Sequence, residues 1–341
     1  MKSTRLLSAA FAAVAMLGAC GGGGSESTAP PPAAAPLAIT VDNQALVARA
    51  AMDGSTALAG AQVLASDDRT TALSAGATAG VTARGAVLGA AQRALALIVP
   101  QQRRTVLSAR SRPLDILPPV TDACGEGGSF TLTVDDRDDD EDISSGDTMT
   151  LAFAQCSELA DERIHGTIVF TFSSVTSETQ FSGTLAFQSV TMTLGHSVTR
   201  ISGSVSIGYQ ETSQIHMELS VGAAGLTASI TTSVYEDSVV YRPGLRIDLI
   251  ETSTASLFSL DGSLSTSALG GLITVATLQP LAQLNGDAFP NSGLMRIDGA
   301  GASRLLVTVL SNTQVQLELD ADGNGIFTPP IVLPWIDLLS D

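Results

Sequence analysis

The chain has 341 residues, of which 44% are hydrophobic and 4% aromatic, and it carries a formal net charge of −17 at pH 7. This length and apolar content suffice for one large or two modest domains with a sizeable core. The negative charge repels phosphate backbones and anionic headgroups, so it argues against nucleic-acid binding and favours contact with cations.

The first twenty residues have the pattern of a secretory signal. Lys2 and Arg5 precede an apolar run, residues 6–17, that is too short to span a bilayer comfortably. The run ends in the sequence LGAC, in which small residues precede Cys20. This ending resembles the lipobox of bacterial lipoproteins.

The resemblance implies that residues 1–19 are a cleaved signal peptide and that Cys20 is acylated. Gly21 stands where an aspartate would retain the protein in the inner membrane, so the resemblance implies an outer-membrane location. Residues 20–36 then form the lipid anchor and a Gly-, Ala- and Pro-rich tether that cannot bury a core. The alternative is an ordinary cysteine that follows an ordinary leader.

Residues 37–123 form an Ala-rich segment that we expect to be helical or irregular. Periodic apolar residues predict a helix over 82–99 and a shorter one over 42–52. Arg84 and Arg93 interrupt the apolar surface of the longer helix, which argues against a transmembrane span. We expect the helices to pack on a sheet, and the alternative is a helix that lies on a membrane surface.

Residues 124–341 change to period-two alternation, in runs such as GTIVFTFSSV and FSGTLAFQSVTMTL that Gly, Ser, Asn and Asp turns separate. Roughly a dozen strands with no helices between them predict antiparallel connections. The expected fold is mainly β: a large antiparallel meander, as a curved sheet, sandwich or partly open barrel, with one or two N-terminal α-helices packed on it. The low aromatic content argues against an outer-membrane barrel.

The chain contains three cysteines, and acylation of Cys20 would leave Cys124 and Cys156 as a pair. Two thiols in an oxidising compartment are expected to form a disulfide. If these cysteines lie directly opposite each other in a hairpin, its centre is near residue 140, and SFTLT (129–133) pairs with DTMTL (147–151). The alternative is two free, buried cysteines.

The tip of this hairpin holds eight acidic residues and one arginine between positions 135 and 147. Alternating carboxylates on a curling backbone converge on one point, and calcium takes six to eight oxygen ligands. The spacing resembles the calcium loops of EF-hands and dockerins, although Glu141 replaces the usual glycine. The predicted ligands are the side chains of Asp136, Asp138, Asp140 and Asp147 and the carbonyl of Asp142. The alternative is a hydrated hairpin tip without a cation.

A second candidate calcium loop is LDADGNGIFTPP, in which Asp320, Asp322 and Asn324 occupy alternate positions. Its last position lacks an acid, unless Asp337 or another strand supplies one. The alternative is a turn built from Asp-Gly and Asn-Gly. The segments FPNSGLMRIDGAGASRL and LELDADGNG resemble the C-terminal part of uncharacterised envelope lipoproteins of proteobacteria, which implies a compartment but no mechanism.

Residue patterns for catalysis are sparse. The three histidines, His165, His196 and His216, lie in strand-like runs, and the sequence has no Gly-x-Ser-x-Gly elbow. We therefore predict a non-catalytic cell-envelope lipoprotein, held on the membrane by its lipid, whose β domain is a calcium-stabilised structural or binding module. The alternative is a carrier that holds a lipophilic ligand between a curved sheet and the N-terminal helices, and an envelope hydrolase is less favoured.

Overall fold

The structure is a computed structural model that describes residues 34–56, 119–138, 142–157, 161–177, 179–231 and 236–339. Its main feature is one 15-stranded antiparallel sheet in which strands that follow each other in the chain pair with each other, except that β8 and β9 each pair with β7 and β10. The predicted fold class, a mainly β meander with an N-terminal helix packed on it, is confirmed.

The longest strands, β4 to β7, have 15 to 17 residues each and lie in the middle of the chain. In chain order the strands are β1 (Val120–Ala123), β2 (Gly127–Asp135), β3 (Thr148–Ser157), β4 (Glu162–Ser177), β5 (Gln180–Leu194), β6 (Ser197–Glu211), β7 (Ile215–Thr231), β8 (Glu236–Tyr241), β9 (Arg246–Glu251), β10 (Ala255–Thr266), β11 (Gly271–Leu284), β12 (Ser292–Asp298), β13 (Arg304–Ser311), β14 (Gln314–Asp320) and β15 (Ile331–Pro334). The helices are α1 (Gln44–Thr56), the 3-10 turn η2 (Ala300–Ala302) and α4 (Trp335–Leu339).

Period-two alternation places apolar side chains on one face of the sheet, and these side chains form the core. In β4, Phe170 and Phe172 are 0% and 1% exposed, and their ring centroids lie 4.7 Å apart. Phe181 of β5 contacts both rings and stacks on Tyr209 of β6 at 5.0 Å. Aromatic contacts therefore cross three neighbouring strands in the longest part of the sheet.

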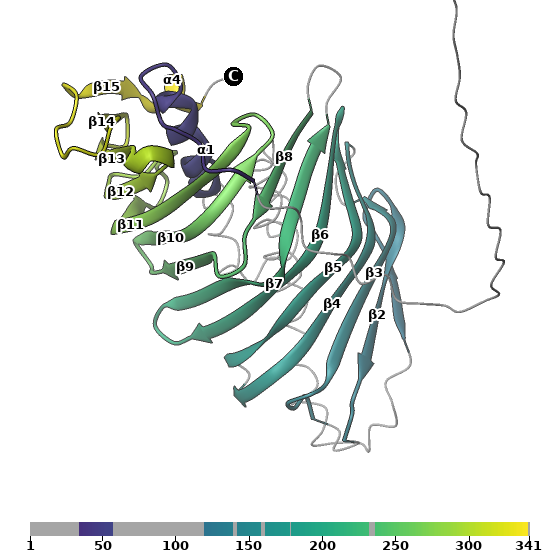
Figure 1. Ribbon diagram of the computed structural model, residues 1–341. Helices are drawn as coiled ribbons and strands as arrows, with labels where there is room; N and C mark the ends of the chain where they lie inside the picture. The colour runs from purple at the N-terminus through teal and green to yellow at the C-terminus, as the bar shows by residue number, and fades with distance from the viewer. Residues whose placement is uncertain are drawn as a thin grey trace, which may run out of the picture.

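The sheet is strongly curved (Figure 1). Strands β2–β7 form one part, and the strands from β9 onwards turn away from them. Bulges interrupt the pairing within several strands, as at Gly166 of β4, which has φ +115°. A side chain there would collide with the backbone of Ser189 on β5, so glycine is required at this bulge.

The N-terminal part of the described chain is tied to the C-terminal strands. Pro36 forms a parallel bridge with Leu272 of β11, and the Ile39 N–H donates to the Ser303 hydroxyl at 2.9 Å. Helix α1, predicted over 42–52, packs on α4, β13 and β14 through buried residues that include Val47 and Ala51. The helix predicted over 82–99 lies outside the described residues, as do the leader and Cys20.

The disulfide between Cys124 and Cys156 is confirmed, with the two Cα atoms 5.4 Å apart. The predicted strand register is wrong by three residues, because Ser129 pairs with Ala154 and Asp135 with Thr148. The cysteines are not direct strand partners: Cys124 lies in the turn between β1 and β2, where it accepts the N–H of Gly127. A bulge at Gln155, with φ +53°, also shifts the ladder beside the bond.

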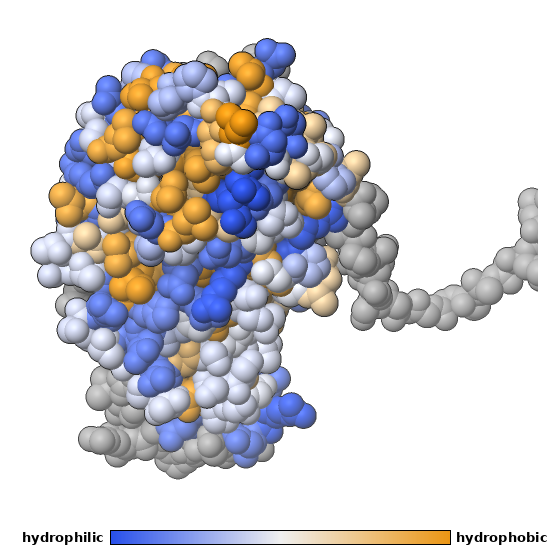
Figure 2. Space-filling view, turned by 60° about the vertical axis from the view of Figure 1, so that its left-hand side comes forward, coloured by the Kyte–Doolittle hydropathy of each residue, from blue (hydrophilic) through white to orange (hydrophobic). Residues whose placement is uncertain are grey.

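Strand pairing begins slightly earlier than the predicted domain boundary at residue 124, because β1 already pairs with β2 from Val120. Among the helices of the described residues, none has the length and apolar character needed to cross a bilayer. On the face shown in Figure 2, small groups of apolar side chains alternate with hydrophilic ones. Such mixed exposure is ordinary for a protein surface.

Candidate functional site

The acidic loop between β2 and β3 brings three aspartates together. Carboxylate oxygens of Asp136, Asp138 and Asp147 all lie within 4.8 Å of one another. Asp136 follows β2 directly and Asp147 precedes β3 directly, so the hairpin itself positions these two residues. Asp138 is exposed, Asp136 is half-buried and Asp147 is only 1% exposed.

Asp147 is fixed from both sides. Its carboxylate accepts the backbone N–H of Arg137 at 2.9 Å and that of Ser144 at 2.6 Å. The backbone carbonyl of Asp147 accepts the N–H of Phe172, and the N–H of Gly146 donates to the carbonyl of Phe172. These two bonds pair the loop with β4. The hydrogen bonds from Arg137 and Ser144 fix the position of the Asp147 carboxylate in the loop.

The loop is also held by its apolar and hydroxyl side chains. Ile143, within the acidic loop, is 6% exposed and belongs to the core. The Ser145 hydroxyl donates to the Ser173 carbonyl at 2.8 Å, and the Ser144 hydroxyl donates to Asp138 at 3.2 Å. The three carboxylates therefore converge on a backbone that the neighbouring strand already orders.

The structure thus places three of the four predicted side-chain ligands within 4.8 Å of each other. The fourth, Asp140, and Glu141 lie outside the described residues. Asp142 is exposed, and its role as a carbonyl ligand stays a prediction. Three close carboxylates repel one another, and a divalent cation among them would replace this repulsion with attraction and supply the charge that oxygen ligands neutralise.

The second candidate loop, after β14, has a different arrangement. The carboxylate of Asp320, 1% exposed, accepts the N–H groups of Gly323, Asn324 and Gly325 at 2.9 to 3.1 Å. The Asn324 amide donates to Asp322 at 2.9 Å. These bonds close a turn in which Gly323 and Gly325 have positive φ, so the local geometry favours the alternative of an Asp-Gly and Asn-Gly turn. Calcium at Asp320, Asp322 and Asn324 stays a prediction.

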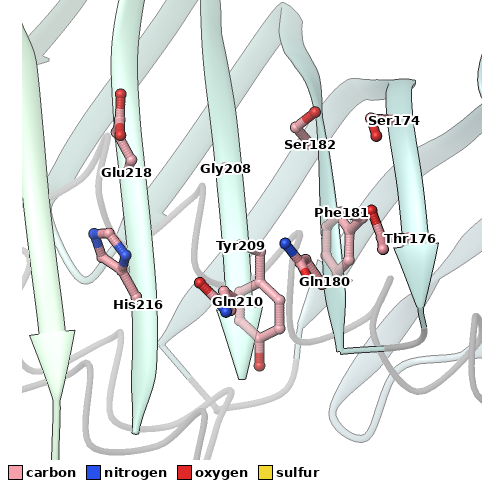
Figure 3. A pocket seen from close by; sticks show the side chains of 10 residues that line it. All are labelled: Ser174, Thr176, Gln180, Phe181, Ser182, Gly208, Tyr209, Gln210, His216 and Glu218. Carbon is pink, nitrogen blue, oxygen red and sulfur yellow. The ribbon is translucent and has the colours of Figure 1, made fainter. Parts of the chain in front are cut away.

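A polar pocket of about 240 Å³ lies across β4–β7 (Figure 3). Two rows of paired residues contribute to it: Gln180, Gln210 and His216 in one, and Ser182, Gly208 and Glu218 in the other. Gly208 lies between Ser182 and Glu218 in the second row and has no side chain to fill the space there. An added Cβ atom at Gly208 would meet nothing closer than the Glu218 side chain at 3.8 Å.

Ionisable residues beside this pocket form a surface network. His216 Nε2 lies 3.1 Å from Asp248 Oδ1, and Arg246 donates to Glu218 at 2.7 Å. Their side chains are 29% to 52% exposed, so water screens these pairs and each contributes little to stability. A hydrolase could use such a histidine as a base, but His216 lies on a part-exposed surface with a carboxylate as its neighbour.

Glu251, the last residue of β9, was not among the predicted site residues. Its carboxyl group is buried, and burial raises its pKa to about 7. The signal was present in the alternation of β9, where Ile247, Leu249 and Glu251 occupy the same face as the core. An acid at the end of a row of buried apolar residues is unusual. Its burial costs free energy unless neighbouring groups or a ligand offset that cost.

A second pocket lies beside Glu251, between the β6–β7 and β9–β10 turns. Both pockets are lined mainly by Ser, Thr, Gln and Glu side chains, and neither is the large apolar cavity that a lipid carrier needs. The carrier alternative stays a prediction. No protein family, no curated protein and no solved structure matches this chain.

Proposed function

We propose that the protein is a lipid-anchored cell-envelope protein whose curved β domain is a non-catalytic structural or binding module stabilised by calcium at the β2–β3 loop. The observation that carries this proposal is the convergence of Asp136, Asp138 and Asp147 within 4.8 Å on a loop whose third carboxylate is 1% exposed. The backbone holds the carboxylate of Asp147 in place, and the carboxylates of Asp136 and Asp138 share one space with it, an arrangement that provides several oxygen ligands for a divalent cation.

The loop belongs to a hairpin that the Cys124–Cys156 disulfide closes at its other end. Disulfides persist in oxidising compartments outside the cytosol, which agrees with the secretory leader and with Cys20 as the lipidated residue. Calcium in extracellular settings is abundant enough to occupy sites with dissociation constants on the order of 10⁻⁴ to 10⁻³ M. A loop with three to five oxygen-bearing side chains suits this affinity range.

Calcium that binds the native loop and not the unfolded chain would raise stability, by about 2.7 kcal/mol at a hundredfold excess over its dissociation constant. The test is a thermal melt in millimolar calcium and in chelator at matched ionic strength. We expect chelation to lower the midpoint of the wild type. Asp138→Asn should remove most of this calcium response, because it removes one of the three converging carboxylates. Asp138 is exposed, and its replacement leaves the hydrogen bonds of the buried Asp147 intact.

The matched control is Asp161→Asn, which removes one exposed carboxylate in the turn before β4, away from the loop. It should keep the full calcium response. If chelator leaves the wild-type midpoint unchanged, or if sodium at the same ionic strength acts as calcium does, the loop is a cluster of surface charge and the proposal is wrong.

A further inference from the structure

Glu251 is a buried carboxylic acid without a hydrogen-bond partner. The residue is 6% exposed, and neither of its carboxylate oxygens contacts a donor within the described part of the chain. Leaving a buried polar group unpaired costs free energy, and leaving a buried charge unpaired costs more. Such a group persists where a ligand or water completes its surroundings.

Strand pairing places Glu251 in a row of residues that crosses five strands. Glu211 of β6 pairs with Ile215 of β7, and Ile215 pairs with Glu251 of β9. Glu251 in turn pairs with Ser256 of β10, and Ser256 pairs with Gln283 of β11. Directly paired residues point to the same face of a sheet, so all five side chains lie on one face. The buried residues Tyr209, Met217 and Leu249, two positions along their strands, lie on the same face.

The two glutamates of this row flank one apolar residue. One strand, β7, lies between them, so their Cα atoms are separated by two strand spacings, about 10 Å. Ile215 is 7% exposed and forms the floor between the two acids. Glu211 is held in place by the Tyr209 hydroxyl, which donates to its carboxylate at 3.0 Å.

Glu211 and Glu251 are both among the residues that line one pocket of about 390 Å³, and the carboxylate oxygens of Glu251 are buried beside it. Its remaining walls come from the β6–β7 turn, which contributes Ser213 and Gln214, from the β9–β10 turn, which contributes Ser253, and from Asn285. The Asn285 amide donates to the Ser253 carbonyl at 2.9 Å, which joins two of these walls. The pocket therefore has an apolar floor, an acid at either side and a neutral polar rim.

We propose that this pocket binds a linear aliphatic diamine, with one ammonium group at Glu251, the other at Glu211, and the methylene chain over Ile215. A cation at Glu251 supplies the partner that the buried carboxylate lacks, and the desolvated pair is then stronger than a surface pair. Neither glutamate belongs to a group of three metal-ligating side chains among the described residues, so an organic cation suits the pocket better than a metal ion.

The site should be sensitive to pH. Burial raises the pKa of Glu251 to about 7, so this acid is mostly neutral at pH 6 and mostly ionised at pH 8. Glu211 is the other titratable residue among those that line the pocket, and it accepts the Tyr209 hydroxyl. The row partners of Glu251, which are Ile215, Ser256 and Gln283, are uncharged. His216 and Asp248 lie on the same strands but on the opposite face.

The test is titration calorimetry of the full-length chain with cadaverine, a five-carbon diamine, at pH 8 and pH 6. We expect binding at pH 8 that becomes roughly tenfold weaker at pH 6, because the ionised fraction of Glu251 falls by about that factor. Pentylamine, with one ammonium group, should bind more weakly than cadaverine, and the neutral pentanediol should not bind.

Glu251→Gln keeps the size of the side chain and removes its charge, so it should weaken cadaverine binding at least about tenfold and abolish the pH dependence. Glu211→Gln should weaken binding but keep the pH dependence. The control is Glu218→Gln, which removes a carboxylate on the opposite face of β7 and should bind as the wild type does. No binding at pH 8, equal binding by the Glu251 and Glu218 variants, or equal affinity for pentylamine would each overturn the proposal.

Discussion

Two buried acids show how differently a protein can treat the same functional group. Asp147, 1% exposed, accepts two backbone N–H groups on a loop that also brings two further carboxylates close. Glu251, 6% exposed, has no donor among the described residues and lies against a pocket. Backbone hydrogen bonds satisfy the first carboxylate, whereas desolvation raises the pKa of the second.

The stability of the protein should reflect Glu251 directly. Its folded pKa of about 7 lies above the unfolded value of 4.5, so the folded state holds this proton more tightly and loses stability as pH rises from 4.5 to 7. In the absence of ligand, the loss at pH 8 should be about 3 kcal/mol. Glu251→Gln should remove it, so the variant should be more stable than the wild type at pH 8 and similar to it near pH 4.5.

Urea unfolding at pH 4.5, 6 and 8 measures this difference, with Glu218→Gln as the exposed control. Because other acids titrate over the same range, the informative quantity is the difference between variant and wild type at each pH. A difference that stays constant from pH 4.5 to 8 would contradict the assignment of a raised pKa to Glu251.

At the scale of single elements, the β2–β3 hairpin is closed by the disulfide at one end and carries the acidic loop at the other. The sequence separation of the two cysteines is 32 residues. Closing a loop of this length lowers the entropy of the unfolded chain by an amount worth about 3 to 4 kcal/mol. We expect the double variant Cys124→Ala, Cys156→Ala to unfold at lower urea concentration by about this free energy.

Reduction of the wild type should reproduce the effect, whereas a reductant should leave the double variant unchanged. The calcium response of the hairpin tip should persist in the variant, since pairing to β4 holds the loop independently of the disulfide. Equal stability of oxidised wild type and double variant would show that the bond contributes nothing to the native protein.

The same hairpin shows what alternation and spacing can predict. The two strands, the acidic tip and the disulfide all follow from patterns within the hairpin, and each agrees with the structure. The register was wrong by three residues because Cys124 lies in a turn and Gln155 in a bulge. Turns and bulges depend on a few backbone torsions that apolar periodicity does not encode.

The candidate pocket could be predicted in part only. Glu251 occupies a core-facing position in the alternation of β9, so its burial was available from the pattern. Its proximity to Glu211 was not, because it depends on β7 pairing with both β6 and β9. Strand β9 is also where the meander departs from a simple order, since β8 and β9 successively occupy the place between β7 and β10.

At the scale of the whole molecule, charge and topology limit how the protein can associate. Residues 124–341 contain 27 acids and seven arginines, a net charge of −20. The ends of the sheet, β1 and β15, are each four residues long, and such short edge strands are poor templates for pairing with another sheet. The sheet domain should therefore neither adsorb to anionic lipids nor extend by edge pairing.

The last prediction is that the proposed lipid at Cys20 attaches the protein to the membrane. Each buried methylene of an acyl chain is worth about 0.8 kcal/mol, so several chains on Cys20 hold a protein on a membrane durably. Cys20→Ser should prevent acylation and shift the protein from the outer-membrane pellet to the soluble fraction, while Ser25→Ala in the tether should leave it in the pellet. Both fractions are washed with high salt, which removes proteins bound by charge and leaves acylated ones in place. If the Cys20 variant stays in the washed pellet, the acidic domain binds the membrane by another route, and the lipid anchor is the wrong explanation.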